Sequence, residues 1–183
     1  IADNTIIIFT ADNGGLSTNA APTSNLPLKG GKGWVYEGGI REPMFVIWPG
    51  IVKPNSICNE PVVTTDFYKT IVDAAGIPEP DQVSDGMSLV PLLKKEMGFE
   101  RKSICWHYPH YSPQGGSPAS AIRSGDWKLI LNYESNQVEL YNLKEDIGET
   151  NDLSKENIEV KKRLENELKE WLKEVDASLP EKR

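Results

Sequence analysis

The residue types best suited to chemistry come near the start of the chain, where an apolar run ends in a carboxylate, a carboxamide and two glycines. Residues 5–10 read Thr-Ile-Ile-Ile-Phe-Thr, and Asp12-Asn13-Gly14-Gly15 follow. Three consecutive β-branched residues favour a strand over a short helix. A continuous apolar run is typical of a strand covered on both faces, as in a parallel sheet. Asp and Asn oxygens suit a hard cation such as Ca²⁺ or Mg²⁺, but two ligands are too few, so the pattern predicts part of a metal site.

A hairpin turn is the competing interpretation of this motif, because Asn-Gly is a strong turn signal. A hairpin requires a second strand immediately afterwards, whereas residues 16–25 are polar and have little strand character. In open α/β sheets, ligands bind beyond the carboxyl ends of the strands. We therefore expect a ligand-bearing loop after residue 10.

The glycine-rich loop, residues 28–43, is the second candidate for chemistry. It carries three cations: Lys29, Lys32 and Arg41. Glycines allow backbone N–H groups and a lysine to approach an anion closely. The loop is not a Walker A motif, because Gly33 stands where Ser or Thr would follow the lysine. A flexible surface loop is the alternative, but Trp34 and Tyr36 among the glycines favour a packed loop.

The segment Trp106-His107-Tyr108-Pro109-His110-Tyr111 is the candidate for substrate selection. Its aromatic rings could stack on a sugar or an aryl group. The alternative is a buried aromatic strand end with ordinary core histidines. A metal site at the two histidines is disfavoured, because no third ligand of matching type lies nearby in the sequence.

The rest of the chain predicts two styles of structure. Residues 44–48 form another continuous apolar run, and residues 66–76 place Phe67, Ile71 and Ala75 at helical spacing as a core stripe. A charged stretch around residue 98 marks a boundary. Beyond it, short alternating segments joined by turns predict an antiparallel sheet: residues 103–108, 119–123, 127–133 and 138–143.

The tail predicts an amphipathic helix over residues 155–175, with one apolar face to pack on that sheet: Val160, Leu164, Leu168, Trp171 and Val175. We therefore expect two domains. Residues 1–98 form an α/β domain, and residues 99–183 form an α+β subdomain.

Composition excludes several classes of protein. The chain has 183 residues, 38% hydrophobic and 26% charged, as in ordinary globular domains. The formal charge of −7 argues against a nucleic-acid partner, and no apolar segment reaches the roughly 20 residues of a membrane span. Cys58 and Cys105 lack metal-site spacing and are expected to be two half-buried thiols rather than one bridge.

In their order along the chain, these segments resemble the type I sulfatases of the alkaline-phosphatase superfamily. The matching pieces cover nearly the whole chain: residues 12–15, 31–43, 48–50, 65–78, 85–89, 121–128, 139–146 and 148–153. The resemblance implies that the first domain is the C-terminal part of an alkaline-phosphatase-like sheet with flanking helices. It also implies a sulfuric ester hydrolase.

The resemblance also assigns roles to residues. It implies a Ca²⁺ site, with Mg²⁺ disfavoured, in which Asp12 and Asn13 are two ligands. It implies that Lys32 contacts the sulfate and acts in catalysis, although by chemistry alone Lys32 and Arg41 are equal candidates for an anion. It implies that Glu37 and Arg41 shape the glycine-rich loop.

Carbohydrate-directed sulfatases carry similar segments near His107, Tyr108 and His110, which implies that these residues bind a sulfated glycan. The nucleophile of the family is a formylglycine made from Cys or Ser in a C/S-x-P-S-R motif, which this sequence lacks. We expect that motif, and the remaining metal ligands, in an N-terminal part of the same sulfatase that precedes Ile1. Family members are usually exported to the periplasm, the extracellular space or the lysosome.

Two other functions compete with a sulfatase. One is a phosphoesterase or phosphonate hydrolase of the same superfamily, which would use an unmodified Thr or Ser and two metals. The other is a non-catalytic module that binds sulfated glycans and would do so without calcium.

Overall fold

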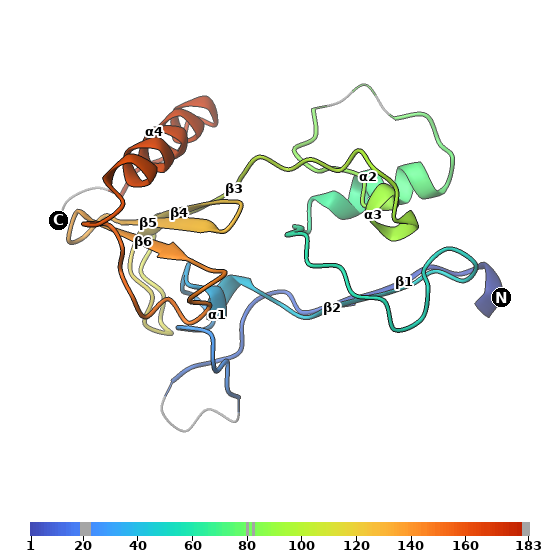
Figure 1. Cartoon of the computed structure of the whole chain (residues 1–183), viewed down its shortest axis with the longest axis horizontal. Coiled ribbons are helices and arrows are strands. Elements are labelled where there is room, and N and C mark those ends of the chain that lie inside the picture. Colours follow the sequence, from blue (N-terminus) through green and yellow to red (C-terminus); the bar gives the residue numbers. More distant parts are fainter. Residues whose placement is uncertain (19–22, 80, 82, 181–183) are drawn as a thin grey trace. The chain divides into compact units, whose positions relative to one another are not determined.

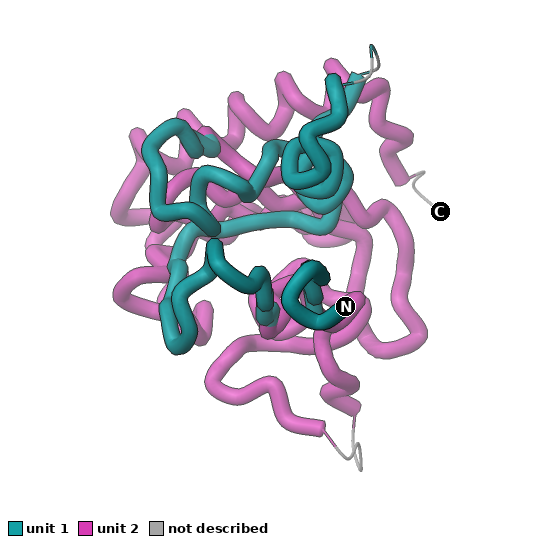
Figure 2. The backbone as a smooth tube through the Cα atoms, turned by 90° about the vertical axis from the view of Figure 1, so that its right-hand side faces the viewer, with its two compact units in different colours: residues 1–9, 44–101 teal, residues 10–43, 102–183 magenta. Residues whose placement is uncertain are grey.

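Figure 1 shows the computed structural model of the chain, which describes residues 1–18, 23–79, 81 and 83–180. Packing divides the chain into two compact units (Figure 2). Unit 1 comprises Ile1–Phe9 and Met44–Arg101, and unit 2 comprises Thr10–Pro43 and Lys102–Arg183. The expected division at residues 98 and 99 stays a prediction about domains, whereas these units follow packing rather than chain order. Residues 19–22 of the expected polar loop lie outside the described residues.

Unit 1 is built from short elements: η1 (Ala2–Asn4), β1 (Ile7–Thr10, whose last residue belongs to unit 2), β2 (Met44–Ile47), α2 (Asp66–Ala74) and α3 (Val90–Lys94). Strands β1 and β2 pair in a two-stranded sheet, which confirms both predicted strands. Their largest apolar side chains are 52–64% exposed: Ile7, Phe9, Phe45 and Ile47. The expectation of a strand covered on both faces is therefore wrong within this chain, because the described residues supply no layer over these side chains.

Helix α2 is where the sequence predicts a helix, and Gly76 follows it at φ +64°. Its buried face is different from the predicted stripe. Ile71 is 59% exposed and Ala75 is also exposed, whereas the buried side chains are those of Asp66 and Thr70. The helix is held by polar contacts on one side, and its apolar side lacks cover from the described chain.

Asp66 is the centre of those polar contacts. Its Oδ2 accepts the Val63 N–H at 2.8 Å, and its Oδ1 accepts the Met87 N–H at 2.9 Å. The Arg101 guanidinium lies 2.6 Å from Oδ1. Because Asp66 is fully buried, this one carboxylate joins three separate segments of unit 1.

Unit 2 contains helix α1 (Glu37–Ile40), strands β3 (Ile104–Tyr108), β4 (Ala119–Ser124), β5 (Trp127–Asn132) and β6 (Gln137–Asn142), and helix α4 (Ile158–Glu174). The four strands form an antiparallel sheet in chain order. The hairpin between β4 and β5 turns at Gly125, whose φ is +59°. The predicted antiparallel sheet and tail helix are confirmed.

The sheet of unit 2 is covered on both faces, by α4 on one and by the region of α1 on the other (Figure 1). The α4 face buries one apolar cluster: Ile122, Leu129, Leu140, Leu164, Leu168 and Leu172. The opposite face buries a second cluster: Val35, Ala119, Ala121, Ile130, Tyr141 and Leu143. Leu172 takes the place expected of Val175, which is 48% exposed just beyond the end of α4.

Two expectations from composition can be compared with the structure. Within the described residues, no helix is both long and apolar enough to cross a membrane. Both cysteines are free thiols, but Cys58 is exposed rather than half-buried. Cys105 is half-buried as expected. Burial, followed by the negative charge of Glu167, raises the pKa of Cys105 to about 12.

Candidate functional site

Two backbone hydrogen bonds join the segment after β1 to the glycine-rich loop. The Gly14 N–H donates to the Gly39 carbonyl at 3.1 Å, and the Lys32 N–H donates to the Gly15 carbonyl at 3.0 Å. Backbone bonds of this kind fix main-chain positions irrespective of side-chain rotamers. The Asp-Asn-Gly-Gly motif and Lys32 are therefore neighbours in the folded chain.

We call this contact between residues 12–15 and the glycine-rich loop the junction. The side chain of Asn25 strengthens it. Its Oδ1 accepts the Gly15 N–H at 3.1 Å, and its Nδ2 donates to the Gly15 carbonyl at 2.8 Å and to the Gly30 carbonyl at 3.1 Å. One carboxamide thus replaces the backbone partner that Gly15 would find in a sheet. The predicted polar loop after Asp12-Asn13 is an ordered part of the site at this residue.

Glycine is required here because the two segments approach too closely for side chains. A Cβ on Gly14 would overlap the Gly38 carbonyl, and a Cβ on Gly31 would overlap the Gly15 carbonyl. Both partners are backbone atoms, which cannot rotate away. The packed-loop interpretation of the glycine-rich segment is confirmed by this geometry.

The junction presents three of the predicted site residues together. Asp12 and Lys32 are exposed, and Asn13 is half-buried with its Nδ2 donating to the Gly14 carbonyl at 3.1 Å. Among the described residues, no group of three or more His, Cys, Asp and Glu side chains is placed to hold a metal ion. The assignment of Asp12 and Asn13 to a metal site stays a prediction.

Glu42, at the end of the glycine-rich loop, lies within electrostatic reach of Asp12. Burial, followed by the negative charge of Asp12, raises the pKa of Glu42. Its Oε1 atom is buried, and in the described part of the chain it has no hydrogen-bond partner. This effect shows that Asp12 and Glu42 lie close enough for their charges to interact.

The other cations of the loop have partners inside unit 2. Lys29 Nζ lies 4.1 Å from the centre of the Tyr36 ring and donates to the Tyr141 hydroxyl at 3.1 Å. Arg41 lies 3.5 Å from Glu37 Oε2. Lys32 and Arg41 are both exposed, so exposure alone does not distinguish these two candidates for an anion contact.

The three predicted glycan-binding residues occupy different environments. Both ring nitrogens of His107 are used within unit 2: Nδ1 lies 2.7 Å from Ser120 Oγ, and Nε2 lies 2.9 Å from the Ser178 carbonyl. Tyr108 is half-buried against the core. His110 is exposed, with its ring edge-on to Tyr108 at 5.6 Å between centroids. Substrate binding by these residues stays a prediction, and His110 is the one most open to a ligand.

The loop that follows these aromatic residues packs against Gly33, directly beside Lys32 in the sequence. Gly33 has φ +87°, and a Cβ on it would overlap Ser112. A Cβ on Gly116 would overlap the Gly33 carbonyl. This contact brings the segment after His110 to the glycine-rich loop.

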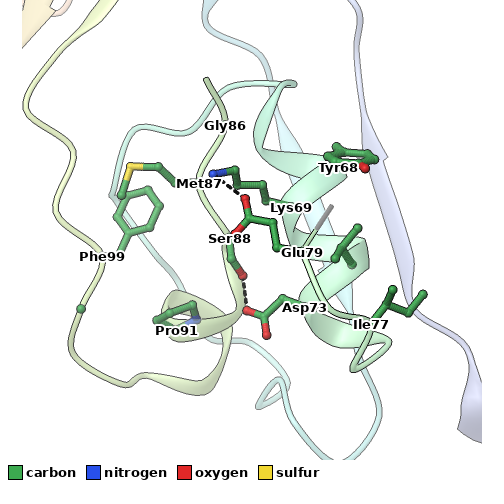
Figure 3. Close-up of a pocket in the computed structure, with 12 residues that line it drawn as sticks. Tyr68, Lys69, Asp73, Ile77, Glu79, Gly86, Met87, Ser88, Pro91 and Phe99 are labelled. Atoms are coloured by element: carbon green, nitrogen blue, oxygen red, sulfur yellow. Dashed lines mark hydrogen bonds and ion pairs between the residues drawn. The ribbon is translucent and has the colours of Figure 1, made fainter. Parts of the chain in front are cut away.

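Figure 3 shows a pocket of about 460 Å³ that lies wholly within unit 1. Polar pairs cross its lining: Lys69 and Glu79 form an ion pair at 2.8 Å, and the Ser88 hydroxyl donates to Asp73. The residues predicted to bind metal, sulfate or glycan do not line it. The pocket is therefore separate from the candidate site.

Two further residues, Lys128 and Glu149, are fully buried behind the glycine-rich loop and were not predicted from the sequence. Lys128 lies between Trp127 and Leu129 in an apolar strand. Its side chain is on the same face of the sheet as that of Ile130, two residues further on. A lysine at an inward position of a strand was the available signal. Glu149 gave no comparable signal, because it lies in a polar loop.

A sequence profile described as N-sulphoglucosamine sulphohydrolase, C-terminal, matches residues 31–177. The chain belongs to this family.

Individual relatives agree with that assignment. A sulfatase of Formosa agariphila is 39% identical over 188 residues, covering 94% of this chain and 34% of the relative. The solved structure of Ps i-CgsB in complex with k-i-k-neocarrahexaose has a TM-score of 0.80 at 32% identity, covering 92% of this chain and 36% of that one. BT4656 in complex with its substrate, D-glucosamine-2-N,6-O-disulfate, has a TM-score of 0.75 at 27% identity, with 99% and 37% covered. The chain thus spans about a third of the length of these proteins.

Proposed function

We propose that this chain is the C-terminal part of a sulfatase that hydrolyses sulfate esters on a carbohydrate. The observation that carries the proposal is the hydrogen bond between Lys32 N–H and the Gly15 carbonyl. It places the backbone of Lys32 beside the motif that contains Asp12 and Asn13. A sulfate needs both a cationic side chain and a metal, because its charged oxygens must be neutralised while the ester bond breaks.

In this proposal, Asp12 and Asn13 would hold Ca²⁺ through their side-chain oxygens. Bound Ca²⁺ supplies Lewis-acid stabilisation of the sulfate oxygens. Lys32 Nζ donates to a sulfate oxygen and orients the group for attack. The nucleophile, a formylglycine, and the remaining ligands come from an N-terminal part of the same protein.

The substrate class is inferred from the solved relatives, which were captured with a carrahexaose and with a sulfated glucosamine. His110 is exposed, and the loop after it packs against the residue that follows Lys32. We infer that His110 and Tyr108 contact the sugar that carries the sulfate. His107 helps to position these residues, because its ring is held by hydrogen bonds to Ser120 and Ser178.

The test uses a full-length sulfatase that contains this chain. Asp12→Ala should abolish turnover of a sulfated disaccharide and weaken calcium binding measured by calorimetry. Lys32→Ala should lower kcat/KM by about 10²–10³-fold without changing calcium affinity. Lys155→Ala, at another exposed lysine of unit 2, is the control. Unchanged turnover in both site variants would refute the assignment.

A glycan-binding module without catalysis is the second candidate. It is favoured by one observation: unit 2 has its own two-sided core and carries all the predicted substrate contacts. Titration of the chain with a sulfated disaccharide, with and without calcium, separates the two functions. Tight binding that ignores calcium supports the module, whereas weak or calcium-dependent binding supports the enzyme.

A further inference from the structure

Lys128 has no role in the proposed chemistry, yet it is the largest of the fully buried side chains. It lies on β5 between two cross-strand neighbours, Arg123 on β4 and Tyr141 on β6. This face of the sheet also packs against Val35 of the glycine-rich loop. The ammonium group of Lys128 therefore points from the sheet toward the loop.

Lys128 contacts two carboxylates, those of Glu37 and Glu149, and we call these three residues the Lys128 cluster. Its Nζ lies 2.9 Å from Glu37 Oε1 and 2.8 Å from Glu149 Oε1. Glu149 Oε2 in turn accepts the backbone N–H of Glu37 at 2.7 Å. Glu37 is thus held at both its side chain and its main chain.

Two further cations lie beside Glu37, so that three positive charges face two carboxylates. Arg41 lies 3.5 Å and Arg123 lies 3.7 Å from Glu37 Oε2. Burying so many charges is costly, and apolar residues of the same volume often give equal or greater stability. Burial raises the pKa of Glu149 despite the opposing effects of Lys128 and the Glu37 N–H. Stability alone is therefore a poor explanation for the cluster.

What the cluster fixes is the part of the loop that contacts the candidate site. Glu37 is the first residue of α1, and Gly38 and Gly39 follow it. The Gly38 N–H donates to the Lys29 carbonyl at 2.8 Å, and the Gly39 carbonyl accepts the Gly14 N–H. Because Glu37 is held in place, so is the nearby Gly39 carbonyl, which binds the Gly14 N–H. Gly14 directly follows Asp12 and Asn13 in the sequence.

We propose that Lys128 is a positioning residue: through Glu37 and Glu149 it sets the glycine-rich loop so that Lys32 and Asp12 keep their mutual geometry. For its effect on catalysis this proposal rests on the proposed sulfatase function. Its structural part does not, because the order of the loop can be measured in the chain itself.

The experiment compares two variants with wild type. Lys128→Met leaves two buried carboxylates without their cation, so it is expected to be unstable. The triple variant Glu37→Gln/Lys128→Met/Glu149→Gln removes the three charges at nearly constant volume and should recover most of the lost thermal stability. It still lacks the Lys128 bonds to both side chains. Lys169→Met, which breaks an exposed ion pair with Glu165, is the matched control.

Hydrogen exchange of the 183-residue chain is the first measurement. In the triple variant, the amides of Gly14, Lys32 and Gly38 should exchange about tenfold faster or more, while the amides of β4 and β5 keep wild-type protection. Unchanged exchange at the three loop amides would overturn the proposal. So would an equal increase throughout unit 2, which indicates a purely structural role.

Turnover in a full-length sulfatase is the second measurement. The triple variant should lose roughly 10–100-fold in kcat with a smaller change in KM, because misplaced groups act mainly in the transition state. Activity that recovers fully together with stability would overturn a role in catalysis. An inactive wild type would refute the sulfatase function, whereas the exchange result on the loop would still decide the role of Lys128.

Discussion

Different interactions stabilise the interior of each of the two units of this chain. Unit 2 has apolar clusters on both faces of a four-stranded sheet. Unit 1 buries Leu89 and Val90 but keeps its strand and helix apolar groups exposed, and the fully buried Asp66 lies at its centre. Burial of apolar area is the main driving force of folding, so unit 2 is largely self-sufficient. Unit 1 has hydrogen-bonded order together with an apolar surface that suits further protein.

Exposed apolar patches usually mark interaction surfaces. The exposed apolar side chains of β1, β2 and α2 are therefore a candidate interaction surface. The contrast between the units predicts that core substitutions should be severe in unit 2, and that in unit 1 the polar centre should be more sensitive than the exposed apolar side chains.

The largest effect is expected at the polar centre of unit 1. Asp66→Ala removes three hydrogen-bond acceptor contacts and leaves Arg101, a mostly buried cation, without its partner. Loss of one partner of a buried ion pair costs about 3–5 kcal/mol. Hydrogen exchange of α2 should show this loss, whereas Glu60→Ala, at an exposed site, should leave it unchanged. Unchanged exchange of α2 in Asp66→Ala would show that Asp66 does not hold unit 1 together.

A matched pair of truncations tests the apolar half of the comparison. Leu168→Ala, on the buried face of α4, should destabilise unit 2 by about 2–5 kcal/mol. Ile71→Ala, on the exposed face of α2, should change stability by less than about 0.5 kcal/mol. Urea denaturation of the chain measures both. In a full-length protein Ile71→Ala should become costly, and equal small effects there would show that the surface stays uncovered.

Acid should weaken unit 2 through Asp152. Burial opposes its ionisation, but N–H groups of Leu140 and Ser154 and the Ser154 hydroxyl outweigh burial and lower the pKa of Asp152. A depressed pKa in the folded state gives stability that is present above the unfolded pKa of about 3.9 and is lost as pH falls through the folded value. Melting temperatures of unit 2 should therefore decline below about pH 4, and Asp152→Asn should flatten the decline. An unaltered pH profile in that variant would contradict this role.

The smallest expected difference concerns the two thiols. Cys58 in unit 1 is exposed, and Cys105 on β3 is half-buried. With a pKa of about 12, only roughly 10⁻⁴ of Cys105 is thiolate at about pH 8, and the thiolate is the reactive form. Iodoacetamide at that pH should label Cys58 alone in the native chain and both residues in urea, as read by mass spectrometry. Equal native labelling would mean that β3 opens readily.

The sequence predicted the parts of the fold that depend on local pattern. Alternation located the four strands of unit 2, Gly125 marked the hairpin, and Leu164 and Leu168 gave the inner face of α4. The same logic failed for α2, where Ile71 is exposed. Apolar spacing shows which face of a helix seeks cover, and only tertiary structure shows whether this chain supplies that cover.

For the candidate site, the sequence indicated which residues could act but gave little about what holds them. Asp12, Asn13 and Lys32 carry recognisable chemistry, and the structure places them at one junction. The short helix α1 could not be predicted, because a helix containing two glycines has weak propensity. Contacts between residues as distant in the chain as Glu37 and Glu149 leave no trace in local spacing.

The excursion of residues 10–43 out of unit 1 has a consequence for recombination between related enzymes. The chain leaves unit 1 after Phe9 and returns at Met44, on paired strands whose rings at Phe9 and Phe45 lie 6.2 Å apart. Because its ends are closely spaced, this segment could be exchanged between related chains. Its conformation, however, depends on Lys128 and Glu149, which lie outside the segment and bind Glu37 within it. A chimera that exchanges residues 10–43 should therefore succeed only when residues 102–183 come from the same parent.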